Sequence, residues 1–124
     1  MRHTFTVTNQ GAVSDGPVYS DQINDECIKH SIYIEFFPND DFIQSELVDE
    51  STMTGTVTFA ATPSHSLDAG VGEKYIATPD SVMVLGSSDP VVPHPAGRVR
   101  RVRATFSGIT GATHYRLIVH SSEG

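Results

Sequence analysis

Several residue types that mark common classes of protein are rare or missing in this chain. There is no Trp, and the single Cys27 excludes an internal disulfide. No stretch approaches the roughly 20 apolar residues of a membrane helix. The first residues, 1–4, lack the apolar run of a signal peptide. These absences predict a soluble protein made in a reducing compartment, with a core of Val, Ile, Leu, Phe and Tyr and with Cys27 as a small buried hydrophobe.

Basic residues are also scarce, and they are unevenly placed. Residues 1–90 hold 3 basic and 14 acidic residues, whereas residues 91–124 hold 5 basic and 1 acidic, for a net charge of −7. The acidic excess argues against a dedicated nucleic-acid binder.

A chain of 124 residues is predicted to form a single domain, residues 1–124, that buries a core without disulfides.

The clearest pattern lies in residues 98–120. Apolar residues alternate with basic or polar ones on both sides of a turn at 107–113, which contains Gly108 and Gly111. Side chains alternate faces along a strand, so this pattern predicts a β-hairpin with one apolar face on each arm. The residues assigned to the apolar faces are Arg100, Val102, Ala104, Phe106, Tyr115, Leu117 and Val119.

Shorter strands are predicted along the rest of the chain, with turn signals between them. They cover residues Thr4–Thr8, Val18–Ser20, Cys27–Phe37, Thr54–Thr62, Tyr75–Ala77 and Ser81–Leu85. Residues 42–50 are the one place where the spacing permits a helical turn, with an irregular strand as the alternative. Seven or eight short strands with little helix favour an all-β fold, an antiparallel β-sandwich or a jelly-roll-like barrel.

Alternation also predicts which side chains of these strands face the core. Near the N-terminus, Phe5 and Val7 are expected to point inward. Gly55 near the start of its strand suggests a β-bulge or a close neighbouring backbone. The remaining inward positions are Ile28, Ile32, Ile34, Phe36, Val57 and Phe59.

No set of residues predicts catalysis, a cofactor or a metal. None of the six histidines has the close spacing of a zinc motif, and His114 and His120 would lie roughly 20 Å apart along one strand. Adjacent carboxylates, as in Asp40–Asp41, point to opposite sides of an extended chain. For the acidic segment 21–26 we favour a solvated loop over a calcium site, because its spacing does not match a calcium loop. The sequence therefore predicts a protein that is not an enzyme.

Three segments resemble small virion proteins of tailed bacteriophages. They are Asp15–Ile23, the "GTVT" of the central strand at 54–58, and the closing stretch 97–116, which contains "RATFSGITGATH". The resemblance spans most of the chain and implies a β-sandwich that is a structural component of the virion. It leaves two roles open, a decoration (cement) protein on the capsid surface or a tail, fibre or adaptor component.

Further properties are implied by the same resemblance. Such proteins are often homotrimers, and a decoration protein would bind the major capsid protein. They are made in the host cytoplasm, and no nucleic-acid or membrane partner is expected. An acidic body with a basic strand fits contacts between subunits of opposite local charge.

The interface hypothesis rests on the basic cluster and on the proline-rich loop before it. The residues assigned to it are Arg98, Arg100, Arg101, Arg103, Pro90, Pro93 and Pro95. Arginine offers a planar fork to carboxylates of another subunit. The alternative is that these arginines pair with acidic groups of the same fold on an adjacent strand and that the loop is a plain surface loop.

A carbohydrate-binding module is the remaining alternative, because sandwiches of this size often carry sugar sites. Such sites usually need exposed aromatic platforms, and the chain has no Trp. The candidate platforms are Tyr19, Tyr33, Tyr75 and Tyr115. Core or strand packing would explain these tyrosines equally well.

Overall fold

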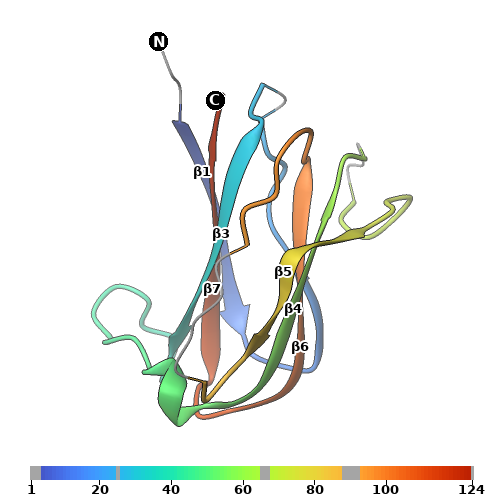
Figure 1. Ribbon diagram of the computed structural model, residues 1–124. Helices are drawn as coiled ribbons and strands as arrows, with labels where there is room; N and C mark the ends of the chain where they lie inside the picture. Colours follow the sequence, from blue (N-terminus) through green and yellow to red (C-terminus); the bar gives the residue numbers. More distant parts are fainter. Residues whose placement is uncertain (1–3, 25, 65–67, 88–92, 124) are drawn as a thin grey trace.

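The computed structural model describes residues 4–24, 26–64, 68–87 and 93–123. In these residues the chain forms two antiparallel sheets packed face to face, with one short 3-10 helix, η1 (Glu50–Thr52) (Figure 1). The three-stranded sheet has the order β1 (Thr4–Ala12), β7 (His114–Ser122), β3 (Lys29–Phe37). The four-stranded sheet has the order β2 (Gly16–Tyr19), β6 (Arg101–Thr110), β4 (Thr54–Thr62), β5 (Ile76–Val84). The predicted all-β sandwich is therefore confirmed.

The core lies between the two sheets and is built from the alternate residues of each strand. At its centre the Phe106 ring packs on the rings of Phe36 and Tyr115, with centroids 6.1 and 5.1 Å apart. Fully buried members are Ile32, Phe36, Met53, Val57, Phe59, Val102, Ala104, Phe106, Leu117 and Val119. The alternation pattern was wrong at the starts of strands. Phe5 and Ile28 were predicted to point inward, but they are 37% and 48% exposed.

The predicted hairpin is wrong, although the faces of its two arms are right. β6 pairs with β2 and β4, and β7 pairs with β1 and β3, so the two consecutive strands lie in different sheets. The turn after Thr110 carries the chain across the sandwich from one sheet to the other (Figure 1). This crossing brings the apolar face of β6 against the apolar face of β7. If β6 and β7 had paired side by side in one sheet, their apolar faces would not have packed against each other and would have needed other strands to bury them.

Irregular backbone marks the pairing of β4 with its neighbours. The register between β4 and β6 shifts between Thr54 and Thr56, at Gly55, which has φ +110°. A Cβ at Gly55 would lie 2.6 Å from the carbonyl oxygen of Gly108, so both the bulge and the close neighbour are confirmed. The two strands predicted at 75–85 are one bent strand, β5, whose bend contains Asp80 at φ +54°.

A single turn occupies the segment that was expected to be helical or irregular. The Ser45 N–H donates to the Asp41 carbonyl over 3.2 Å, and the Asp41 carboxylate accepts from the N–H groups of Ile43 and Gln44. No helix in the described residues is long and apolar enough to cross a membrane.

Candidate functional site

The four arginines of the proposed interface lie in different environments. Arg98 is exposed and Arg103 is half-buried, whereas Arg100 and Arg101 are only 5% and 7% exposed. In the loop before them, Pro93 and Pro95 are buried, and Pro90 lies outside the described residues. Side chains that this chain itself covers are poorly placed to meet a partner. The interface stays a prediction, and Arg98 and Arg103 are its accessible arginines.

Arg101 takes part in a buried network on the outer face of the four-stranded sheet, which we call the Glu73 clamp. Its Nε donates to Glu73 Oε2 over 3.2 Å, and its Nη1 donates to the Ser20 carbonyl over 2.9 Å. Glu73 Oε1 accepts from the Gly70 N–H at 2.6 Å and from the Tyr75 hydroxyl at 2.9 Å. Arg101 thus pairs within the fold, as the alternative predicted, but its partner lies in the loop before β5 and not on an adjacent strand.

The protonation of the clamp follows from these bonds. Burial alone would raise the pKa of Glu73, but the Gly70 N–H, the Tyr75 hydroxyl and Arg101 hold it below its ordinary value. Burial and the bond to Glu73 raise the pKa of Tyr75. The guanidinium of Arg103 stacks 4.6 Å from the Tyr75 ring centroid, which adds a cation–π contact. The clamp therefore holds an ionised carboxylate against a fixed arginine and a neutral tyrosine.

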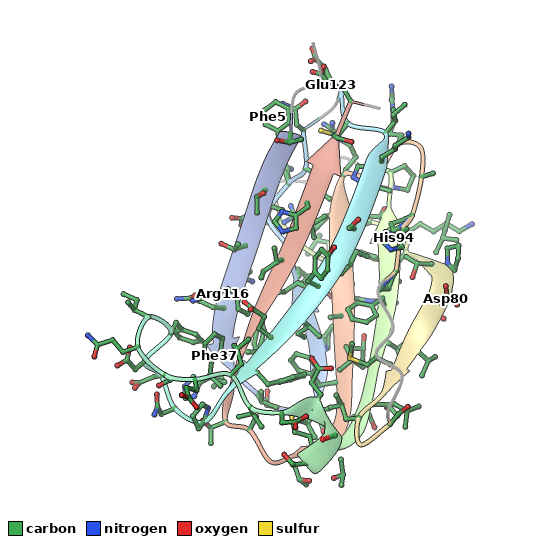
Figure 2. The ribbon with its side chains drawn as sticks, turned by 60° about the vertical axis from the view of Figure 1, so that its left-hand side comes forward. Phe5, Phe37, Asp80, His94, Arg116 and Glu123 are labelled. Carbon is green, nitrogen blue, oxygen red and sulfur yellow. The ribbon has the colours of Figure 1, made fainter. Side chains whose placement is uncertain are left out.

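A second arginine–glutamate pair lies on the outer face of the three-stranded sheet, which Figure 2 shows. Arg116 Nη1 is 3.5 Å from Glu35 Oε1, its Nε donates to Gln10, and its Nη2 donates to the Phe42 carbonyl over 2.8 Å. Its guanidinium also lies 5.0 Å from the Phe37 ring centroid. Arg116 therefore ties the loop after β3 to the sheet.

The other end of the same outer face is hollowed into a cleft of about 710 Å³, which we call the histidine cleft. It lies over the start of β3, the end of β7 and the start of β1, with residues 94–96 along the β3 side. His94 and His120 are exposed in it, and each uses Nδ1 for a hydroxyl, Ser31 at 2.9 Å and Thr6 at 2.8 Å respectively. Figure 2 shows His94 beyond β3, on the side away from β7.

His30 forms the floor of this cleft and is 3% exposed. Its Nδ1 bonds Ser121 Oγ over 2.7 Å, and its Nε2 bonds the Gly97 carbonyl over 3.0 Å. Burial lowers the pKa of His30, against an opposing effect of the bond to Gly97. A neutral His30 that donates to Gly97 and accepts from Ser121 satisfies both ring nitrogens, so it joins β3, β7 and the 93–97 segment.

The tyrosines divide between packing and exposure. Tyr115 is in the core, and the half-buried Tyr19 and Tyr75 pack on each other with centroids 5.8 Å apart. Tyr33 is 38% exposed, with its ring edge-on to His120 at 5.4 Å. Tyr33 is therefore the candidate sugar platform that the fold leaves open.

Cys27 behaves as the packing interpretation predicted. Cys27 is 1% exposed in the core, and burial, together with Glu123 and Glu26, raises the pKa of its thiol. The described residues contain no group of three or more His, Cys, Asp or Glu side chains arranged to hold a metal ion.

Sequence reasoning missed the histidine cleft and the Glu73 clamp. His94 and His120 are 26 positions apart, and they line the same cleft only because β7 pairs with β3 and residues 93–97 run beside β3. Parity within a strand had already placed His120 on an outward face. The remaining information, which strands are partners and where the loops run, has no local signal in the sequence.

Comparison with known proteins gives a likeness in structure alone. No family model matches the chain, and no curated protein matches it in sequence. The chain is similar to the crystal structure of the SPBc2 prophage-derived protein YomS, with TM-score 0.55 and 11% identity over 98% of this chain and 96% of that one. It is also similar to a chain from the disulfide-linked pili of Bacillus endospore appendages, with TM-score 0.48 and 9% identity over 99% and 89%. At these identities the likeness to the prophage-derived protein shows a shared fold.

Proposed function

We propose that this chain is a structural protein of a phage virion and that it acts by assembly, not by catalysis. The observation that carries the proposal is the fold shared with a prophage-derived protein over nearly the whole of both chains. The segments that resemble phage virion proteins support it independently, because they were identified from the sequence. The separation of a basic end from an acidic body also suits contacts between subunits.

Within the virion we propose a capsid decoration protein, made in the host cytoplasm, that forms a homotrimer and binds the major capsid protein. The accessible arginines, Arg98 and Arg103, would meet carboxylates of the partner. An exposed arginine–carboxylate pair contributes little by itself. A decoration protein repeats each contact at many identical sites, so small contributions add up over the particle.

Replacing both accessible arginines by serine tests this interface. We expect Arg98→Ser with Arg103→Ser to weaken binding to particles about threefold to tenfold, the sum of one exposed and one half-buried charge pair. The measurement is co-sedimentation of the purified chain with particles, quantified as copies per particle. Lys74→Ser, an exposed basic residue outside the cluster, is the matched control.

Each proposed detail has its own readout. Light scattering should give three times the 13.4 kDa chain mass if the protein is a trimer. Gold-labelled antibody should mark heads; labelled tails would favour the tail, fibre or adaptor role. A wild-type chain that stays at the top of the gradient, apart from all particles, would contradict a virion role altogether.

A carbohydrate-binding module is the second candidate, and the exposed ring of Tyr33 beside His120 is the observation that favours it. On a glycan array, such a module should show reproducible binding that Tyr33→Ala abolishes. Tyr19→Ala, at a ring packed within the fold, should leave that binding in place.

A further inference from the structure

The histidine cleft presents a continuous row of polar side chains across three strands. Thr6 lies opposite His120 in the β1–β7 register, and His120 lies opposite Ser31 in the β7–β3 register. His94 continues the row beyond β3 through its bond to Ser31. All four side chains therefore reach the same outer surface, alternating hydroxyl and imidazole.

In both exposed imidazoles a neighbouring side chain engages one ring nitrogen, Nδ1, and the second ring nitrogen is Nε2. Each Nδ1 is engaged by a hydroxyl, Thr6 for His120 and Ser31 for His94. When the hydroxyl donates to Nδ1, a neutral imidazole keeps its proton on Nε2. His94 and His120 then each offer an N–H donor to a ligand in the cleft.

A second row next to the first adds a cation. Lys29 is exposed and lies between Ser122 on β7 and Ala96 on the 93–97 segment. Thr4 continues this row on β1, opposite Ser122. Lys29 is one of only two lysines in the chain, and the other, Lys74, does not line the cleft.

Among the residues that the structure describes, no carboxylate lines the cleft, in a chain whose net charge is −7. The described residues that form the cleft are threonine, serine, histidine, lysine and a few apolar side chains. Glu123 follows Ser122, but it lies beyond the end of β7 (Figure 2). The cleft is thus locally donor-rich and cationic on an otherwise acidic molecule, which is the chemistry that receives an anion.

We propose that the histidine cleft binds an oxyanion, a phosphate or sulfate group, held by Lys29, His94 and His120. The buried His30 fixes the cleft by joining β3, β7 and the 93–97 segment, so the donors are in place before the ligand arrives. The oxyanion could be free or carried on a saccharide, and both forms share the recognised chemistry. This inference does not depend on the virion role.

Titration of the isotope-labelled full chain with inorganic phosphate, followed by amide chemical shifts, tests the proposal. We expect shifts confined to the amides around residues 29–31, 94–97 and 120–122. Lys29→Gln and His120→Gln should each weaken phosphate binding about fivefold to tenfold, the loss of a hydrogen bond to a charged group at a partly open site. Higher salt should weaken binding as well.

Two control variants separate a built site from general charge effects. Lys74→Gln removes the other lysine, and His114→Gln removes a histidine from the far end of β7 that contacts Phe42. Both should bind phosphate as the wild-type chain does. Equal loss in Lys29→Gln and Lys74→Gln, or no shifts at all, would overturn the proposal.

A second set of probes identifies the carrier of the anion. Binding of a sulfated polysaccharide more tightly than inorganic sulfate, through the same amides, would place the oxyanion on a saccharide. Equal affinities would indicate a free anion, and both results support an oxyanion site. Binding of the matching neutral polysaccharide with the same affinity, insensitive to salt, would overturn it and favour a Tyr33 sugar site.

Discussion

In the described residues an arginine–glutamate pair lies on the outer face of each sheet, and these two pairs differ mainly in burial. The side chains of Arg101 and Glu73 are 8% and 0% exposed, whereas those of Arg116 and Glu35 are 26% and 28% exposed. The pairs also differ in their surroundings. Glu73 accepts three hydrogen bonds, while the Arg116 guanidinium is held mainly by Gln10 and a carbonyl.

The comparison shows that the same two residue types have different roles on the two faces. A buried charge that loses its partner has little water to replace it, so breaking the buried pair of Arg101 and Glu73 is costly. An exposed pair exchanges its partner for solvent at little cost. The Glu73 clamp therefore holds the loop before β5 in place, and the Arg116 pair orients a loop that other contacts also hold.

Removing one carboxylate charge from each pair should give the largest difference between the faces. We expect Glu73→Gln to lower the free energy of unfolding by about 3 kcal/mol, since the buried Arg101 loses the charge of Glu73. Glu35→Gln should cost about 0.5 kcal/mol. Urea unfolding followed by circular dichroism measures both values. Similar costs for the two variants would show that burial does not separate the pairs.

Lowering the pH should reduce the difference in the free energy of unfolding between wild type and Glu73→Gln. Because the folded pKa of Glu73 lies below its ordinary value of 4.5, its contribution is complete above that pH. The contribution is lost as the pH falls through the lower folded pKa. A stability difference that stays constant on acidification would indicate that the carboxylate charge is not what stabilises the clamp.

The backbones of the two sheets can be compared through one glycine in each. Gly55→Ala should cost about 2–3 kcal/mol, because φ is +110° and the new Cβ would meet the Gly108 backbone at 2.6 Å. At Gly11 in β1 a Cβ would meet only the Tyr115 side chain, at an ordinary 3.5 Å. We expect Gly11→Ala to change stability by less than about 0.5 kcal/mol. Thermal unfolding would measure the stability of both variants. A small loss of stability in Gly55→Ala would mean that the bulge can relax.

The smallest effect concerns histidines of the three-stranded sheet. Since burial lowers the pKa of His30, the unfolded chain binds more protons than the folded one as the pH falls below 6.5. The free energy of unfolding should therefore decrease on going to about pH 5. His30→Gln should flatten this dependence, as measured by urea midpoints. The same slope in His30→Gln and wild type would assign the dependence to another group.

Local pattern predicted much of the fold and little of the sites. The strands at Lys29–Phe37 and Thr54–Thr62 and the inward faces of β6 and β7 follow from alternation, because a half-buried strand imposes it. Alternation does not say which strands are partners, so the crossing from β6 to β7 was missed. At the ends of strands, alternation also cannot tell a buried position from an exposed one at the edge of the core, which is why Phe5 and Ile28 were misassigned.

The sites depend on contacts between distant segments. Arg101 meets Glu73 because the loop before β5 folds over the sheet, and His94 meets Ser31 because residues 93–97 run along β3. Neither approach has a sequence signal of its own. The charge asymmetry was visible in the sequence, but it did not reveal that two of the four arginines are buried.

The central place of β7 has a consequence for how the protein is made. β1 and β3 both pair with β7, which follows them in the chain, with Thr4 opposite Ser122 at one end. While the ribosome is still adding residues 38–113, the two earlier strands have no central strand to join, because β7 has not yet been made. Folding of this sheet must wait for β7, and pairing over such long sequence separations is slow. A nascent chain of this kind would need protection from aggregation until its last described strand emerges.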